Sequence, residues 1–235
     1  MNNTNFQKKS LNDVKTSVIK ITPSAPASAR KYFYLIMKRT VDIVGSSLGL
    51  LLTAPIFFII MFLYLSGQNK GPIFFRQIRV GVNGKRFNMY KFRSMIVNAE
   101  EVLKNDPALY KKYLKNNYKL EPEEDPRITK LGMFLRRTSL DELPQLLNVL
   151  KGDMSIVGPR PVIEDELKEY TNRLTEFLTV KPGVTGYWQI CGRSDVGYPE
   201  RAELEFFYID NQGFKLDIKI FVLTILIVIT KKGAY

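Results

Sequence analysis

The sequence contains no histidine and only one cysteine, Cys191. Histidine usually performs general acid or base catalysis near neutral pH, so a catalytic role here falls to Asp, Glu, Lys, Tyr or a substrate phosphate. A single cysteine excludes an intramolecular disulfide and a cysteine-based zinc site, which suits a reducing compartment. We expect Cys191 itself to be a small, buried hydrophobic residue.

Negative charge is also scarce, because 23 Asp and Glu residues stand against 35 Lys and Arg residues, a formal net charge of +12. A surplus of this size favours an anionic partner: nucleic acid, an acidic membrane face or a phosphorylated substrate. Charge alone does not choose among the three. At 235 residues the chain is long enough for one main domain with its own core.

One long segment, from Ile43 to Leu65, lacks charged residues altogether. At about 1.5 Å per helical residue it is just long enough to cross a hydrocarbon layer of roughly 30 Å, so length favours a spanning helix. Pro55 within the segment bends a helix. Basic residues flank the segment on both sides, whereas a spanning helix normally leaves one flank poorer in Lys and Arg. We therefore favour a re-entrant helix that turns at Pro55 and leaves by the face it entered.

The chain divides into a flexible basic leader (residues 1–35), a re-entrant membrane helix hairpin (36–68) and a main domain (69–235). The leader is polar and lacks the apolar stretch of a cleaved signal peptide. The apolar run Ile220–Thr230 is too short to cross a bilayer alone. It is predicted to be a core helix or a helix in the membrane interface, and its β-branched residues leave a core strand open.

Local patterns predict the elements of the main domain. The Asn83-Gly84 pair predicts a β-hairpin turn, and residues 98–117 predict a helix interrupted near Pro107. Further along, we expect a polar helix over 162–178, a strand and loop from Pro182, and a helix over 200–211.

The stretch SLDELPQLLNVLKG places two adjacent carboxylates, Asp141 and Glu142, near the start of a helical pattern. Ser139 and Glu142 fit a capping box, the leucines recur at helical spacing, and Gly152 fits a C-cap, so we predict a helix over residues 140–151. On this interpretation the two carboxylates need only favour the positive end of a helix.

The same geometry also suits catalysis. Successive side chains on a helix point about 100° apart, so the two carboxylates cannot bind one atom symmetrically and should have separate tasks. One would be a nucleophile or metal ligand, and the other a base or a supporting partner. A helix N-terminus favours the anion, so we expect a lowered pKa for Asp141.

The surrounding cations indicate a phosphate as the target. Arginine binds phosphate oxygens bidentately and lysine supplies a point charge. Cationic residues beside turns or aromatic residues are spread over distant segments: Lys91, Arg93, Arg136, Arg137, Arg160 and Arg193. Because carboxylates and a diphosphate repel each other, a divalent cation is the natural bridge, and Mg²⁺ habitually pairs few carboxylates with substrate phosphates.

Five motifs together resemble the bacterial sugar transferases: YKFRSM (90–95), DPRITKLG (125–132), RRTSLDELPQLLNVLKGDMSIVGPRP (136–161), PGVTGYWQICGR (182–193) and LDIKI (216–220). The resemblance runs in order from about Lys38 to the C-terminus, and its long middle motif is highly specific. These monotopic polyprenyl-phosphate phosphoglycosyl transferases start cell-surface glycan assembly. The resemblance implies a helix-rich α+β fold with a re-entrant N-terminal membrane helix and a cytoplasmic catalytic domain, in the family's minimal form.

The resemblance also implies roles for individual residues. The family's Asp-Glu dyad falls on Asp141 and Glu142; the Asp attacks the β-phosphate of a UDP-sugar and belongs to the Mg²⁺ site. UMP leaves, and the phosphosugar passes from Asp141 to polyprenyl phosphate. The family breaks its membrane helix at a Ser-Pro pair, which is Ala54-Pro55 here, so the kink rests on Pro55. The implied substrate-binding residues are Lys91, Arg136, Arg160, Arg193 and Asp217.

The implied function is transfer of a sugar-1-phosphate from a UDP-sugar to undecaprenyl phosphate, the first membrane step of capsule, exopolysaccharide or O-antigen synthesis. The form of GYWQICGRSD favours a hexose, galactose or glucose. The expected location is the cytoplasmic face (inner leaflet) of the bacterial inner membrane; no nucleic-acid partner is expected, and a homo-oligomer stays open.

Two other classes compete with this enzyme. A non-catalytic membrane adaptor of a glycan assembly or export complex would use its basic surface and not need Asp141 or Glu142. A nucleic-acid binder also suits the charge, but the apolar segment and the lack of a recognisable nucleic-acid motif disfavour it.

Overall fold

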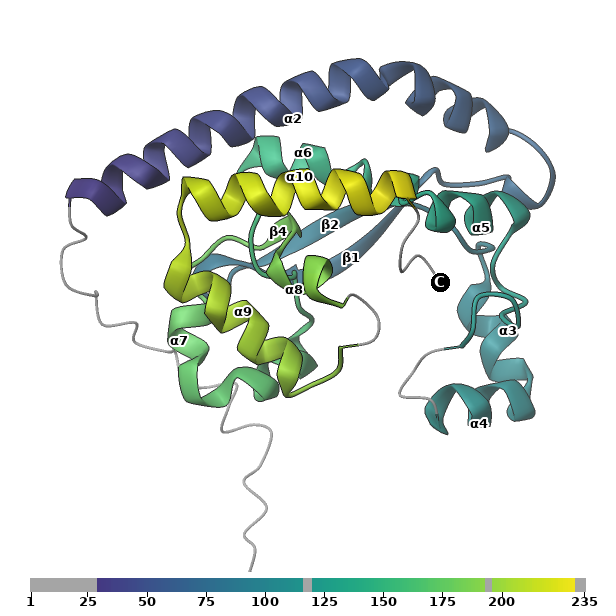
Figure 1. Ribbon diagram of the computed structural model, residues 1–235. Helices are drawn as coiled ribbons and strands as arrows, with labels where there is room; N and C mark the ends of the chain where they lie inside the picture. Colours follow the sequence, from purple (N-terminus) through teal and green to yellow (C-terminus); the bar gives the residue numbers. More distant parts are fainter. Residues whose placement is uncertain (1–28, 116–119, 193–195, 231–235) are drawn as a thin grey trace, which may run out of the picture.

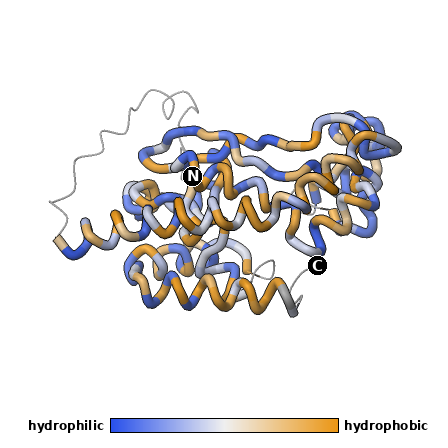
Figure 2. The backbone as a smooth tube through the Cα atoms, turned by 90° about the horizontal axis from the view of Figure 1, so that it is seen from above, coloured by the Kyte–Doolittle hydropathy of each residue, from blue (hydrophilic) through white to orange (hydrophobic). Residues whose placement is uncertain are grey.

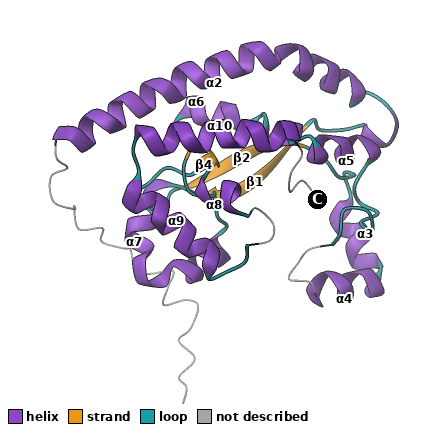
Figure 3. Ribbon diagram, in the orientation of Figure 1, coloured by secondary structure: helices purple, strands orange, loops and turns teal. Residues whose placement is uncertain are grey.

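A computed structural model describes residues 29–115, 120–192 and 196–230 (Figure 1). The α-helices are α2 (Ala29–Leu63), α3 (Ala99–Asn105), α4 (Pro107–Lys115), α5 (Lys130–Arg137), α6 (Gln145–Lys151), α7 (Leu174–Phe177), α8 (Tyr187–Cys191), α9 (Glu200–Asn211) and α10 (Phe214–Thr230). The strands are β1 (Phe74–Val80), β2 (Arg86–Phe92), β3 (Ser155–Val157) and β4 (Gly183–Thr185). The 3₁₀ helices are η1 (Gly67–Asn69), η2 (Val82–Gly84), η3 (Leu140–Glu142) and η4 (Glu164–Arg173). Figure 3 shows how little of the fold is strand, which confirms the helix-rich α+β class.

The long apolar segment lies within one continuous helix, α2, which includes Pro55 and arches over the rest of the molecule (Figure 1). Its 35 residues extend over roughly 50 Å at about 1.5 Å per residue. By length and composition α2 could cross a membrane, and only 11% of its most apolar window is buried. The expected hairpin over residues 36–68 is therefore not two helices: residues 36–63 belong to the single helix α2. The re-entrant course of this helix stays a prediction. Most of the predicted leader, residues 1–28, lies outside the described residues, whereas 29–35 begin α2.

Both halves of α2 pack on the same domain. Arg39 donates to two carbonyls near the end of α6 (2.6 and 2.8 Å). The buried Asp42 accepts hydrogen bonds from the Ser155 hydroxyl (3.0 Å) and from a backbone N–H of β3 (2.9 Å). Near the other end, Ile60 packs in a core cluster with Phe92 of β2. The domain therefore holds α2 close along its length.

The first two strands form the predicted hairpin. β1 pairs antiparallel with β2 along its whole length, from Phe74 opposite Phe92 to Val80 opposite Arg86. The connecting turn needs a left-handed backbone, which asparagine and glycine tolerate. Their φ values of 57° at Asn83 and 74° at Gly84 confirm the prediction.

The interruption predicted near Pro107, within the helix expected over 98–117, is confirmed, because α3 ends at Asn105 and α4 begins at Pro107. Asp106 leaves the helical path, and its carboxylate accepts from the first backbone N–H groups of α4 (2.9 and 3.0 Å). The strand expected from Pro182 is β4.

Other predicted elements differ from those observed. The polar helix expected over 162–178 is mostly the 3₁₀ helix η4, and only α7 is α-helical in that range. The short helix α8, after β4, was not predicted. Cys191, at the end of α8, is exposed rather than buried.

The C-terminal run forms helix α10, which excludes the core strand. Figure 1 shows α10 running below α2 and over α8 and α9. The largest core cluster joins this helix, through Ile220, to Tyr208 of α9 and Val157 of β3. Figure 2 shows hydrophobic residues recurring along both α2 and α10.

Candidate active site

The acid pair lies on η3, a single 3₁₀ turn between α5 and α6. Ser139 precedes it in a left-handed conformation (φ 56°), and its side chain makes no capping hydrogen bond. The predicted capping box is therefore absent, and the helix expected over 140–151 is divided into η3 and α6. Gly152 ends α6 with φ 87°, as predicted.

Apolar residues fix this turn in place. Leu140 and Leu143, on either side of the acid pair, pack against the core cluster that contains Phe92 and Leu135. The same cluster includes Ile60 of α2. The acid pair is therefore anchored at a junction of the hairpin, α5 and the apolar helix.

The two carboxylates have different surroundings. The Lys91 ammonium of β2 lies 2.7 Å from Oε1 of Glu142. Burial, and then the negative charge of Glu142, raise the pKa of Asp141 to about 6, while Lys91 and Arg136 act in the opposite direction. The expected lowering was wrong, because one 3₁₀ turn supplies little helix dipole and desolvation is the larger effect.

Arg136 is brought to the acid pair by a close approach of α5 to the chain after β2. Its Nε donates to the Ser94 hydroxyl at 2.8 Å. A Cβ at Gly132 would lie 1.8 Å from the Ser94 carbonyl oxygen, so this approach requires glycine. Thr129 fixes the start of α5 by accepting a hydrogen bond from the Gly132 N–H at 2.9 Å. The short motif before the acid pair thus positions a cation beside Asp141.

A small hollow of about 30 Å³ lies beside Glu142. Its polar lining includes Arg79, Lys91, Glu142, Gln145, Arg160 and Gln189. A Cβ at Gly183 would lie 2.1 Å from the backbone nitrogen of Gly158, so two glycines let β4 approach the loop that carries Arg160. The structure thus brings together three of the predicted site residues, Lys91, Glu142 and Arg160.

Sequence reasoning missed Arg79 and Gln189. Arg79 lies in β1 between two apolar residues, yet only 8% of it is exposed. One signal in the sequence could have identified Arg79: it is a charged residue at a position that is buried in the paired strand. Arginine is rarely buried without a partner. Gln189 lies on α8, a short helix between Gly186 and Gly192. The glycines around it led to the prediction of a loop.

Asp217 lies in a different cluster, between α2, α9 and α10. It accepts hydrogen bonds from the hydroxyls of Tyr34 and Tyr208 (2.8 Å each) and from the Lys38 ammonium (2.7 Å). The hollow beside Glu142 is not lined by Asp217. Arg193, the remaining predicted residue, lies outside the described residues.

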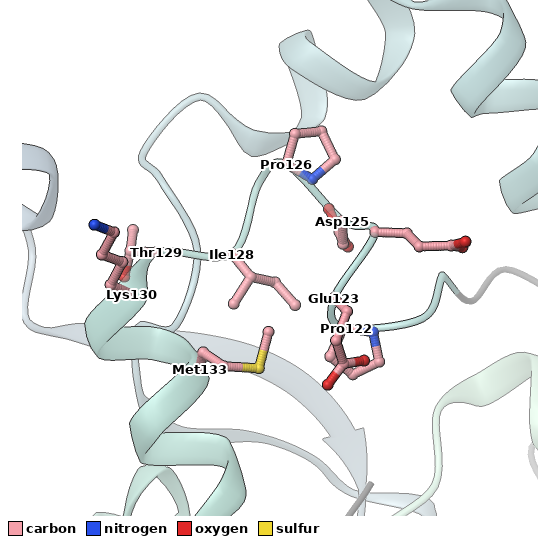
Figure 4. A pocket seen from close by; sticks show the side chains of 9 residues that line it. Pro122, Glu123, Asp125, Pro126, Ile128, Thr129, Lys130 and Met133 are labelled. Carbon is pink, nitrogen blue, oxygen red and sulfur yellow. The ribbon is translucent and has the colours of Figure 1, made fainter.

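A larger hollow of about 440 Å³ lies between the loop at residues 122–128 and α5 (Figure 4). No predicted site residue lines it. Its acidic side chains are paired with neighbouring cations, as in the 2.7 Å bridge between Asp125 and Arg127. The hollow beside Glu142 is therefore the better candidate for a reactive site.

The acid pair fits a Mg²⁺ ion only if a substrate supplies further ligands. Over residues 29–115, 120–192 and 196–230, no group of three or more His, Cys, Asp or Glu side chains could hold a metal. Asp141 and Glu142 repel each other, which helps to raise the pKa of Asp141. A small cation would relieve this repulsion, and Mg²⁺ commonly completes its shell with water and substrate phosphates. The pair thus fits a site that is filled together with a phosphorylated substrate.

Comparison with known proteins identifies the chain. The family model described as bacterial sugar transferase matches residues 33–231, which include the hairpin, the acid pair and the hollow. The chain belongs to the bacterial sugar transferase family. The resemblance found in the five motifs is confirmed. Within this bacterial sugar transferase, Lys91, Arg136, Asp141, Glu142 and Arg160 all lie inside the matched region.

Three relatives of this sugar transferase carry informative names. The undecaprenyl-phosphate galactose phosphotransferase of Salmonella typhimurium is 46% identical over 85% of the chain, which covers 42% of that protein. The exopolysaccharide production protein ExoY of Rhizobium meliloti is 42% identical over 84% of the chain and is covered over 88% of its own length. The UDP-glucose:undecaprenyl-phosphate glucose-1-phosphate transferase of Escherichia coli is 40% identical over 85% of the chain and is 42% covered. The chain thus spans less than half of the first and third relatives.

Proposed function

We propose that this protein transfers a sugar-1-phosphate from a UDP-sugar to undecaprenyl phosphate, with Asp141 as the nucleophile. The observation that carries the proposal is the geometry around the acid pair: Lys91 lies 2.7 Å from Glu142, and Lys91 and Arg160 line the hollow beside it. Burial also raises the pKa of Asp141 to about 6. Two relatives whose names state this type of reaction share the region.

The first step forms a bond between an Asp141 carboxylate oxygen and the β-phosphorus of the UDP-sugar. The bond from that phosphorus to the bridging oxygen breaks, and its electron pair leaves with UMP. Lys91 and Arg136 neutralise charge around the phosphoryl group, which is the main requirement of phosphoryl transfer. Desolvation keeps Asp141 more basic than an exposed aspartate, and it remains ionised at neutral pH.

In the second step, a phosphate oxygen of undecaprenyl phosphate attacks the same phosphorus. The bond to Asp141 breaks and the carboxylate is restored, so one phosphate linkage replaces another without an external energy source. Glu142 pairs with Lys91 at 2.7 Å and so holds the Lys91 ammonium beside the acid pair. Mg²⁺ bound by Asp141 and substrate phosphates would supply charge neutralisation during both steps.

We propose that the protein lies on the inner leaflet of the bacterial inner membrane, with the catalytic domain in the cytoplasm. Exposed apolar residues along α2 and α10 support contact with lipid. Both halves of α2 also pack on one domain, through Asp42 at β3 and Ile60 at the core cluster of Phe92. If α2 spanned the hydrocarbon layer, one of its halves would have to move away from this domain. The contacts of both halves therefore support a helix that stays at one face of the membrane.

The proposed donor is a hexose, galactose or glucose. The names of the relatives support this choice, since one names galactose and another glucose. A pocket discriminates such sugars by one hydroxyl group, so the donor is to be assigned by assay.

UMP release from a panel of UDP-sugars, with Mg²⁺ and with or without undecaprenyl phosphate, tests the proposal. We expect release to require Asp141 and a lipid-linked sugar phosphate to form only with the acceptor. A folded protein in membranes that releases no Asp141-dependent UMP from any donor, while a known family member does, would leave the adaptor as the function.

A further inference from the structure

The residues that line the hollow beside Glu142 carry more positive than negative charge, and one of the cations, Arg79, was not predicted as a site residue. Arg79, Lys91 and Arg160 all line it, whereas Glu142 is its one acidic lining residue. Glu142 is already paired with Lys91 at 2.7 Å. The positive charge of Arg160 disfavours the charge of Arg79.

Arg79 is fixed in this hollow by three of its five N–H groups. Nη1 donates to the Pro161 carbonyl at 3.0 Å and lies 3.4 Å from the Glu166 carboxylate. Nη2 donates to the Gln77 side chain at 2.7 Å. Nε is buried and has no hydrogen-bond partner among the residues that the structure describes. Burial, and next Arg160, lower the pKa of Arg79 to about 10, so it stays cationic at neutral pH.

Arg160 shows the same incompleteness. Within the described part of the chain, its Nε is buried and has no hydrogen-bond partner. The Arg160 guanidinium lies 5.1 Å from the Trp188 ring centroid, which fixes its plane. Its backbone N–H donates to Glu205 at 3.0 Å. Burial raises the pKa of Glu205 to about 8, and the charges of Arg160 and Arg201 act in the opposite direction.

Two buried guanidinium donors with surplus positive charge fit an anion. Native proteins pair nearly all buried polar groups, so the unpaired Nε atoms of Arg79 and Arg160, two residues that line one hollow, indicate a missing ligand. Guanidinium groups bind phosphate oxygens through pairs of N–H donors. Because Glu142 lines the same hollow, a phosphate oxygen held there lies next to the acid pair.

We propose that Arg79, together with Arg160, binds the phosphate of the donor nucleotide that departs with the nucleoside. This inference rests on the proposed function, since it names a further residue for the same reaction. When the bond between the β-phosphorus and the bridging oxygen breaks, negative charge develops on the departing phosphate. Arg79 and Arg160 are held in place beforehand, so they stabilise that charge without reorganisation.

The test measures binding of UDP, uridine and inorganic pyrophosphate to the full-length protein in nanodiscs by isothermal titration calorimetry. We expect Arg79→Met to weaken UDP and pyrophosphate binding by about 10- to 100-fold, the loss of one to two charged hydrogen bonds. Uridine binding should not change. Arg79→Lys, which keeps the charge and loses the fork, should fall between the wild type and Arg79→Met.

Two controls separate phosphate binding from a structural role of Arg79. Glu166→Gln removes its ionic partner while keeping a side-chain acceptor, and should leave UDP affinity within about threefold of the wild type. Arg86→Met removes an arginine of the next strand that is paired with Glu164 on the surface, and should have no effect. Circular dichroism confirms that each variant is folded.

Unchanged UDP affinity in folded Arg79→Met would overturn the inference, as would an equal loss in Glu166→Gln. The proposed function fails separately. If Asp141-dependent UMP release persists while UDP binding ignores Arg79, the transferase stands and the role of Arg79 is wrong. If pyrophosphate binding depends on Arg79 but no UDP-sugar reacts, the anion site stands and the transferase is wrong.

Discussion

Two clusters built around carboxylates differ in how completely their polar atoms are bonded. Asp217 receives three hydrogen bonds of 2.7 to 2.8 Å, from Tyr34, Lys38 and Tyr208. Around Glu142, one ion pair at 2.7 Å lies beside a hollow with unpaired nitrogens on Arg79 and Arg160, as far as the described residues extend. A fully bonded buried network favours one arrangement of the chain, whereas an incomplete one gains most when a ligand arrives.

The positions of the two clusters match this difference. The Asp217 cluster joins α2 to α9 and α10, where the apolar helix meets the domain. The acid pair lies on a 3₁₀ turn whose carboxylate at Asp141 has a raised pKa. The first cluster therefore joins distant elements of the fold, and we propose that the second takes part in the chemistry.

The largest expected effect is on activity at the incomplete cluster. Asp141→Asn removes the nucleophile and should reduce UMP release by about 10³-fold or more. Its melting temperature should equal or exceed that of the wild type, because a desolvated, mutually repelling charge is removed. UMP release and thermal unfolding are measured on the same preparation, and a large loss of stability would contradict this assignment.

The next effect is on stability at the bonded cluster. Asp217→Asn leaves the Lys38 ammonium, 13% exposed, without its ionic partner and should lower the free energy of unfolding by about 3 kcal/mol. The double variant Lys38→Met/Asp217→Asn should recover much of that loss, because the unpaired ammonium is then absent and the amide oxygen still accepts from a tyrosine hydroxyl. Thermal unfolding in detergent compares the three proteins. A double variant no more stable than Asp217→Asn would show that the pair does not act as a unit.

A smaller effect joins activity to pH. Glu142→Gln breaks a pair whose side chains are 26% and 41% exposed, so stability should change by less than about 1 kcal/mol. Asp141 must be ionised to attack, so activity falls as pH drops through its pKa. Because the charge of Glu142 raises that pKa, the acid limb of the pH profile should move to lower pH in Glu142→Gln. If the acid limb does not move at equal Mg²⁺ concentration, the charge of Glu142 does not influence the pKa of the group that limits activity.

The smallest effect should be at the surface. Arg86 and Glu164 form an ion pair whose side chains are 62% and 58% exposed. Arg86→Met should change neither UMP release nor the melting temperature measurably. A marked effect of Arg86→Met on UMP release would mean that functional cationic residues of this protein cannot be recognised by their burial and hydrogen bonding.

Sequence patterns predicted local features well. The Asn83-Gly84 turn, the C-cap at Gly152 and the helix over residues 200–211 follow from backbone preferences that neighbouring residues determine. The family motifs identified the acid pair and placed Lys91, Arg136 and Arg160 near it.

Other features depended on tertiary contacts that no local pattern contains. The raised pKa of Asp141 arises from burial beneath neighbouring elements, so the expected dipole effect gave the wrong direction. Arg79 and Arg160 are far apart in the sequence, and only the fold brings both of them to the lining of one hollow. Asp217, which the resemblance groups with the substrate-binding residues, accepts hydrogen bonds from Tyr34 and Lys38 of α2, a contact between distant parts of the chain.

The most direct test uses a UDP-sugar with a radioactive β-phosphate, incubated without acceptor lipid. The account predicts label on the wild-type protein and on folded Asp217→Asn, and none on Asp141→Asn. Label retained by Asp141→Asn, or lost from folded Asp217→Asn, would contradict the division between a reactive cluster and a structural one.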